Sequence, residues 1–238
     1  MLVIFMLVMC MSQNKKQDEI QNRKQNEQQA MEHIERLEQE NREKNQKAFT
    51  VVIDPGHGGE DPGKIGINQA QEKDLNLIIA QKVQKILEEK EYIVMMTRTT
   101  DAGMNPNKEL SQIDDLDARV KLMNEIAPKI AVSIHQNSYI DENIKGAQVF
   151  YYKDSKEGEW AAQIMQESLR KLDPENHREM KDNDSYYLLR RTQTPIIIVE
   201  CGFLSNASEA DKLVDDEYQN QLAEAIARGI EMYFTQDK

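Results

Sequence analysis

Short apolar runs alternate with longer amphipathic stretches along most of the chain. The apolar runs have the length and β-branched character of buried strands, and they fall at residues 49–53, 92–96, 130–134, 146–152 and 195–199. The amphipathic stretches repeat apolar residues at helical spacing, and they fall at residues 72–90, 115–127, 155–172 and 217–234. Because strands and helices alternate, we predict an α/β fold in which helices cover both faces of a mostly parallel, twisted sheet.

The first 47 residues follow neither pattern. Residues 12–47 contain eight Gln, five Asn, eight acidic and eight basic residues, a composition that cannot build an apolar core. Residues 1–11 form an uncharged apolar run, shorter than the about 20 residues that span a bilayer but close to the apolar region of a signal peptide. We expect a signal or anchor remnant at 1–11, a disordered or helical linker at 12–47 and a single folded domain at 48–238.

The apolar run departs from a complete signal peptide in two ways. No basic residue precedes it, whereas Lys15 and Lys16 follow it, and residues 8–10 lack the small side chains that usually precede a cleavage site or a lipidated cysteine. One interpretation is a disordered apolar tip. We favour another, in which Met1 is an internal start and upstream basic residues complete an N-terminal membrane anchor. The domain would then be exported or anchored at the cell envelope, outside the cytoplasm.

The net charge belongs to the predicted domain. The chain has 30 basic and 42 acidic residues, which gives a net charge of −12. Because the eight acids and eight bases of residues 12–47 cancel, residues 48–238 carry 34 acids against 22 bases. Such a surface repels a phosphate backbone, so we expect no nucleic-acid partner.

Polar side chains follow three of the predicted strands. His57 comes after the first strand, His135 directly after the third and Glu200 directly after the last. The carboxyl ends of parallel strands meet at one edge of a sheet, so we expect these side chains to lie together. Glu72 opens the helix that the first loop enters, and two histidines with one carboxylate make a zinc-ligand set with a position left for water. Either histidine alone would be interpreted as an ordinary core or surface residue.

Three other chemistries fit the sequence less well. Residues 54–59, Asp-Pro-Gly-His-Gly-Gly, match neither the dinucleotide-binding nor the P-loop pattern. Ser133 lies inside a predicted strand and lacks the sharp turn of a hydrolase nucleophile. Cys201 could act as a nucleophile, but the adjacent acid at Glu200 would raise the pKa of its thiol. We therefore interpret Cys201 as a small buried hydrophobe.

Four ordered sequence blocks carry a resemblance to a known family. They are residues 52–59, Glu72 with Asn76 four residues later, residues 133–138 and residues 199–206. In this order they resemble the signature blocks of the zinc-dependent N-acetylmuramoyl-L-alanine amidases, the amidase_3 family, across about residues 49–237. The resemblance implies that the predicted domain is a zinc amidase catalytic domain.

The resemblance also implies roles for individual residues. It implies zinc on His57, Glu72 and His135, with Glu200 as the catalytic acid and base. The implied substrate is peptidoglycan, cut at the amide between the lactyl group of N-acetylmuramic acid and the L-alanine of the stem peptide. Asn137 would face the same side as His135 if the strand continues, so we expect it to hydrogen-bond substrate.

Within the family, the chain most resembles the sporulation amidases of spore-formers. The resemblance lies in the sequence Glu-Cys-Gly-Phe-Leu-Ser-Asn at residues 200–206, the small size and the N-terminal apolar segment. It implies action on cortex peptidoglycan at the forespore, where these enzymes prepare the muramic-δ-lactam that germination enzymes recognise. Gln136 and Ser138 replace alanines common in the third block, which leaves the predicted ligand intact but bears on substrate preference. No long self-blocking insertion is visible, so we expect a separate envelope protein to activate the enzyme.

Two further functions stay open at this point. One is a wall-binding or activator module that has lost its chemistry, and the other is a zinc hydrolase of a different amide. Loss of chemistry usually removes a ligand or the catalytic acid, and all four residues are present, so we favour the enzyme.

The remaining polar residues receive structural interpretations. We expect Arg98 and Arg119 to brace loops or pair with acids, and His33 and His177 to be solvated.

Overall fold

The computed structural model describes residues 49–104 and 111–236, and six residues nearer the N-terminus. The chain divides into two units, residues 1–46 and residues 47–238. Residues described in the first unit, among them Gln28 and Gln39, are helical and exposed. The predicted apolar segment 1–11 lies outside the described residues, as does most of the predicted linker. Among the helices of the described residues, none is long and apolar enough to cross a bilayer.

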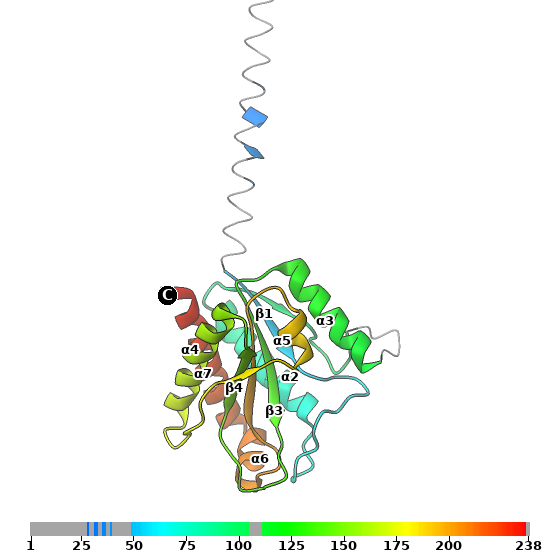
Figure 1. Cartoon of the computed structure of the whole chain (residues 1–238), viewed down its shortest axis with the longest axis vertical. Helices are drawn as coiled ribbons and strands as arrows, with labels where there is room; N and C mark the ends of the chain where they lie inside the picture. Colours follow the sequence, from blue (N-terminus) through cyan, green and yellow to red (C-terminus); the bar gives the residue numbers. More distant parts are fainter. Residues whose placement is uncertain are drawn as a thin grey trace, which may run out of the picture. The chain divides into compact units, whose positions relative to one another are not determined.

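The second unit is built on one six-stranded sheet (Figure 1). Its strands are β1 (Thr50–Pro55), β2 (Ile93–Met96), β3 (Ile130–Asn137), β4 (Gln148–Tyr152), β5 (Lys181–Asn183) and β6 (Ile196–Phe203). They lie in the order β2-β1-β3-β6-β4-β5. The first four strands of this order are parallel, whereas β4 pairs with β6 in the antiparallel direction and carries β5 beside it. The mostly parallel sheet predicted from the sequence is confirmed.

The reversal of β4 follows from its connection. Parallel neighbours in a sheet need a crossover of a dozen or more residues, usually a helix. Residues 138–147 join β3 to β4 without a helix, so the chain turns at the end of β3 and comes back down the sheet.

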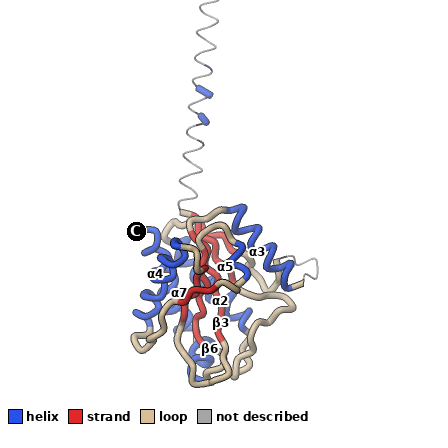
Figure 2. The backbone as a smooth tube through the Cα atoms, viewed as in Figure 1, coloured by secondary structure: helices blue, strands red, loops and turns tan. Residues whose placement is uncertain are grey.

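Helices cover both faces of the sheet, with the strands between them in Figure 2. The helices are α2 (Glu72–Glu88), α3 (Gln112–Ile126), α4 (Lys156–Leu172), α5 (Tyr187–Arg191), α6 (Ala207–Val214) and α7 (Asp216–Thr235). One buried cluster joins α2, α4 and α7 to one face, and a smaller cluster joins α3 and α5 to the other. Successive residues of β1 show the alternation, because Val51 and Ile53 enter the larger cluster and Val52 the smaller.

Two central strands are longer than predicted. The apolar pattern predicts strand ends at 134 and 199, but β3 continues to Asn137 and β6 to Phe203. His135 and Glu200 therefore lie inside their strands, not after them as the sequence analysis expected, and the register pairs these two residues. The extension of β3 is polar, His-Gln-Asn, whereas that of β6 has one polar residue, Glu200, followed by Cys-Gly-Phe.

Three short elements were not predicted from the sequence. They are β5, α5 and α6. The strand β5 consists of Lys-Asp-Asn and has no apolar residue to mark it, and α5 has only five residues, too few to show a helical period.

Candidate active site

The loop that follows β1 brings His57 to the edge of the sheet where the parallel strands end. The strand β1 ends at Pro55, and the next backbone N–H, from Gly56, donates to the carbonyl of Ile134 at 3.0 Å. A Cβ atom at Gly56 would lie 2.2 Å from the ring of His135, so only glycine lets this backbone pass the imidazole. The chain then turns through a left-handed conformation at His57, with φ of 62°, which directs the loop toward α2.

Three predicted ligands come together at this edge. His57 comes from the loop after β1, Glu72 from the first turn of α2 and His135 from β3. One potential ligand atom from each lies within 4.8 Å of the other two. Glu72 Oε1 lies 3.2 Å from His57 Nε2 and 2.9 Å from His135 Nδ1. The geometry therefore matches a site for a metal ion held by two imidazole nitrogens and a carboxylate.

Neighbouring groups fix the orientation of these side chains. Asp61 Oδ2 lies 2.8 Å from His57 Nδ1, which leaves Nε2 of that ring facing the cluster. Backbone N–H groups hold the carboxylate of Glu72, since Lys64 donates to Oε2 at 2.8 Å and Gln136 donates to Oε1 at 3.1 Å. Asp61 was not singled out in the sequence, because nothing local distinguishes it from its acidic neighbour Glu60. Hydrogen bonds of this kind are the usual support of metal-binding histidines and carboxylates.

The cluster keeps its carboxylate ionised. Burial alone would raise the pKa of Glu72, but the adjacent His135 and His57 hold it far below its ordinary value. Burial alone would lower the pKa of His57, but hydrogen bonds and charge from Glu72 and Asp61 raise it to about 9. The site thus stabilises positive charge, and a bound divalent cation would supply that charge in place of protons on the histidines.

Glu200 lies opposite His135 on the neighbouring strand. It is 8% exposed, and its Oε2 atom is buried without a hydrogen-bond partner among the described residues. Burial raises the pKa of Glu200 to about 7; the two histidines lower it, while the nearby Glu72 raises it. A carboxyl group with such a pKa can both accept and return a proton near neutral pH.

The site opens into a cavity of about 360 Å³. Its lining includes all four predicted residues and Asn137, together with residues from the opposite wall: Lys64, Leu116, Gln136, Ser138, Tyr186, Tyr187, Leu188 and Ile198. The predicted substrate residue Asn137 ends the extended strand β3 and lines this cavity, and its Oδ1 accepts a hydrogen bond from the N–H of Ser138 at 2.8 Å. The wall formed by Tyr186 and Leu188 was missed because it belongs to the unpredicted α5 region.

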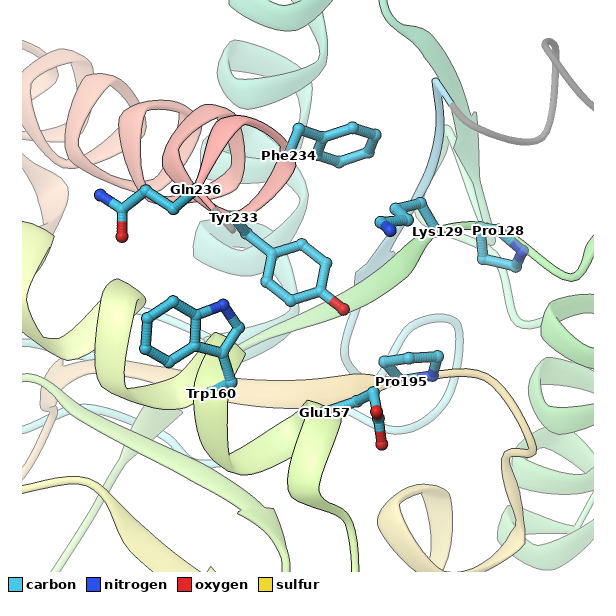
Figure 3. Close-up of a pocket in the computed structure, with 8 residues that line it drawn as sticks. All are labelled: Pro128, Lys129, Glu157, Trp160, Pro195, Tyr233, Phe234 and Gln236. Atoms are coloured by element: carbon cyan, nitrogen blue, oxygen red, sulfur yellow. The ribbon is translucent and has the colours of Figure 1, made fainter. Parts of the chain in front are cut away.

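A larger hollow, of about 560 Å³, lies at the opposite end of the strands (Figure 3). The rings of Trp160, Tyr233 and Phe234 lie across from Lys129, and Pro195 immediately precedes β6. The residues that line it include one acid and no histidine, so it lacks a set of metal ligands like that of His57, Glu72 and His135. The smaller cavity is therefore the candidate active site.

The two arginines near the site brace loops, as the sequence predicted. Arg98 donates to the carbonyls of Pro55 and Gly56 at 3.0 Å each. Arg119 donates to the carbonyl of His57 at 2.7 Å and pairs with Asp54 at 2.6 Å. Both guanidinium groups therefore hold the histidine loop in place.

Two other interpretations of single residues are confirmed, and one lies outside the described residues. Cys201 is buried, and burial raises the pKa of its thiol, followed by the charge of Glu200. His177 is exposed, and His33 lies outside the described residues.

Comparisons with known proteins identify the family of the chain. The sequence model of a family described as N-acetylmuramoyl-L-alanine amidase matches residues 51–232. The germination-specific N-acetylmuramoyl-L-alanine amidase of Bacillus subtilis is 38% identical over 190 residues, which cover 78% of this chain and 80% of that protein.

Solved structures give the same result. The CwlD amidase of Clostridioides difficile, solved in complex with the GerS lipoprotein, has a TM-score of 0.76 at 34% identity, covering 79% of this chain and 100% of that one. The catalytic domain of the amidase CwlV from Bacillus (Paenibacillus) polymyxa has a TM-score of 0.68 at 32% identity, covering 77% of this chain and 97% of that one.

Proposed function

The chain belongs to the N-acetylmuramoyl-L-alanine amidase family, and we propose that it depends on zinc and acts in spore cortex maturation. As a member of that family it is a peptidoglycan amidase. The bond it hydrolyses joins N-acetylmuramic acid to the L-alanine of the stem peptide. Zinc dependence and the place of action are the parts that we propose.

One observation carries the zinc proposal: the ligand atoms of His57, Glu72 and His135 converge within 4.8 Å. They share a cavity with Glu200, whose buried Oε2 has no hydrogen-bond partner among the described residues. Two imidazoles and one carboxylate are a donor set of catalytic zinc sites that keep one position open. His57 Nε2, a Glu72 oxygen and His135 Nδ1 would hold the ion. A bound Zn²⁺ supplies Lewis acidity, which polarises the substrate carbonyl and lowers the pKa of water toward about 7.

The protein itself supplies the proton transfers. Glu200 accepts a proton from the attacking water and delivers it to the departing amide nitrogen, which its pKa of about 7 allows in both directions. Asn137, at the end of β3, hydrogen-bonds the substrate and holds the scissile amide within the cavity. Asp61 keeps the His57 ring in the orientation that presents Nε2.

The proposed biological setting rests on the relatives. The similarity to the germination-specific amidase of Bacillus subtilis supports action on cortex peptidoglycan, with muramic-δ-lactam as the later product. The complex of CwlD with a lipoprotein supports an activating envelope protein as a partner of this chain. Both settings place the domain outside the cytoplasm, with residues 1–11 as the proposed export signal or membrane anchor.

Variants of the four residues test the site. His57→Ala, Glu72→Ala and His135→Ala should each lose bound zinc and activity, measured by metal analysis and by zymography on purified peptidoglycan. Glu200→Gln removes the base but no ligand, so it should keep zinc while turnover falls at least about 100-fold. The exposed His177→Ala serves as the matched control and should keep both zinc and activity. Full zinc occupancy in the three ligand variants would contradict the metal site, and near-normal turnover of Glu200→Gln would contradict the acid–base role.

A further inference from the structure

Lys64 occupies the rim of the active-site cavity. It belongs to the loop between β1 and α2, and its backbone N–H donates to Glu72 Oε2 at 2.8 Å, which anchors its main chain directly beside the proposed metal ligands. Its side chain is exposed and lines the same cavity as Asn137. The backbone of Lys64 is thus held in place, while its exposed ammonium group is able to contact a substrate.

The other cations near the site are already engaged. Arg98 and Arg119 are buried against backbone carbonyls and Asp54. Lys73 donates to the carbonyl of Gly59 at 2.9 Å and pairs with Asp101 at 2.8 Å. By contrast, no carboxylate of the described residues lies within 4.0 Å of the Lys64 ammonium. Lys64 is also the only lysine or arginine among the residues that line the described cavity.

The net charge of the domain indicates a role for this single cation. The domain carries 34 acids against 22 bases. This net negative charge disfavours an acidic substrate, and a cation at the cavity rim would offset it locally. A peptidoglycan stem peptide is such a substrate, since its second residue is a glutamate joined through its side chain, whose α-carboxylate is free unless it is amidated.

We propose that the Lys64 ammonium binds the α-carboxylate of the second stem residue and makes the enzyme prefer stems in which this group is not amidated. The inference rests on the proposed function. Consecutive Cα atoms of a peptide are about 3.8 Å apart, so the second residue begins one residue length beyond the alanine whose amide is cut. The backbone N–H of Lys64 donates to Glu72, and its four-carbon side chain is long enough to extend one residue length beyond the cut amide.

Two synthetic muramoyl peptides test this specificity. They are identical except that the second stem residue carries an α-carboxylate in one and an α-carboxamide in the other. The wild-type enzyme should favour the carboxylate by about fivefold or more in kcat/KM, the range of a partly exposed charge-assisted hydrogen bond. Lys64→Gln should raise KM for the carboxylate substrate and bring the two kcat/KM values together, while Lys64→Arg keeps most of the preference. Rising salt should reduce the wild-type preference.

A charge-matched control and a binding arm complete the test. Lys121→Gln removes the same charge from the exposed face of α3, beside Glu125, and should keep the wild-type preference. In the inactive Glu200→Gln background, calorimetry should show that Lys64→Gln weakens binding of the carboxylate peptide and not of the carboxamide. A wild-type enzyme that cleaves both peptides equally well, or a Lys64→Gln variant that keeps the preference, overturns the assignment. Cleavage of neither peptide by the wild type would instead overturn the proposed function and this assignment with it.

Discussion

Arg119→Met should be one of the most destabilising single substitutions in the domain. Arg119 is 2% exposed and pairs with Asp54, which is 0% exposed, at 2.6 Å. It also pairs with Asp115 at 2.6 Å and donates to the carbonyls of Pro55 and His57. Methionine keeps most of the volume but leaves the buried carboxylate of Asp54 without its cation.

The expected loss is about 3–5 kcal/mol at pH 7, the cost of breaking a buried ion pair from one side. That is a large part of the about 5–15 kcal/mol that stabilises a typical domain. Burial alone would raise the pKa of Asp54, but Arg119, Ser133 and Thr97 together hold it below its ordinary value.

The pH dependence follows from this shift. In the wild type, Asp54 takes up a proton more readily in the unfolded state than in the folded state once the pH falls below about 4. The stability that this ion pair contributes is therefore lost as the pH falls further. In Arg119→Met, burial without the cation raises the pKa of Asp54, so the variant can protonate Asp54 while folded. The stability difference between the two proteins should therefore shrink as the pH falls from 7 to 4.

Urea unfolding of the metal-free proteins, followed by the fluorescence of the single tryptophan, Trp160, measures this difference. The double variant Asp54→Asn with Arg119→Met is the control, because it also removes the buried carboxylate that the single variant leaves unpaired. It should recover part of the lost free energy of unfolding. A loss below about 1 kcal/mol for the single variant, or a double variant no more stable than the single one, would refute the reasoning.

Three further predictions concern the surroundings of the site. Asp61→Asn should lower zinc affinity about 10- to 100-fold in competition with a chromophoric chelator, because the His57 ring loses its anchor; an unchanged affinity would count against that role. Gly56→Ala should lower both zinc content and melting temperature, because its Cβ would lie 2.2 Å from the His135 ring, and a stable, fully loaded variant would be the contrary result. Cys201 should resist iodoacetamide in the native protein and react in urea, as followed by mass spectrometry, since it is buried with a raised pKa; native labelling would show the thiol to be accessible.

The sequence predicted the sheet and the ligand set because both leave strong signals. Buried strands such as β1 and β6 contain continuous apolar runs, and the carboxyl-end rule then brings His57, His135 and Glu200 to one edge. The ends of β3 and β6 were missed because each apolar run stops at polar residues that line the cavity, His135 to Asn137 in β3 and Glu200 in β6.

Other features leave no local signal. The direction of β4 is set by its partner β6, far away in the sequence, and by the lack of a crossover helix. The wall formed by Tyr186 and Leu188 depends on a five-residue helix that packs through tertiary contacts rather than periodicity. Asp61 sits in a polar, glycine-rich loop where only the folded geometry distinguishes it from its acidic neighbour Glu60.

The most direct test of the central claim is mass spectrometry of the peptides released from purified peptidoglycan, with and without a chelator. The site of His57, Glu72, His135 and Glu200 predicts free stem peptides that begin with L-alanine, lost on chelation and restored by added zinc. Release of fragments cut at glycosidic or peptide bonds instead, or amide cleavage that persists after complete metal removal, would contradict the account.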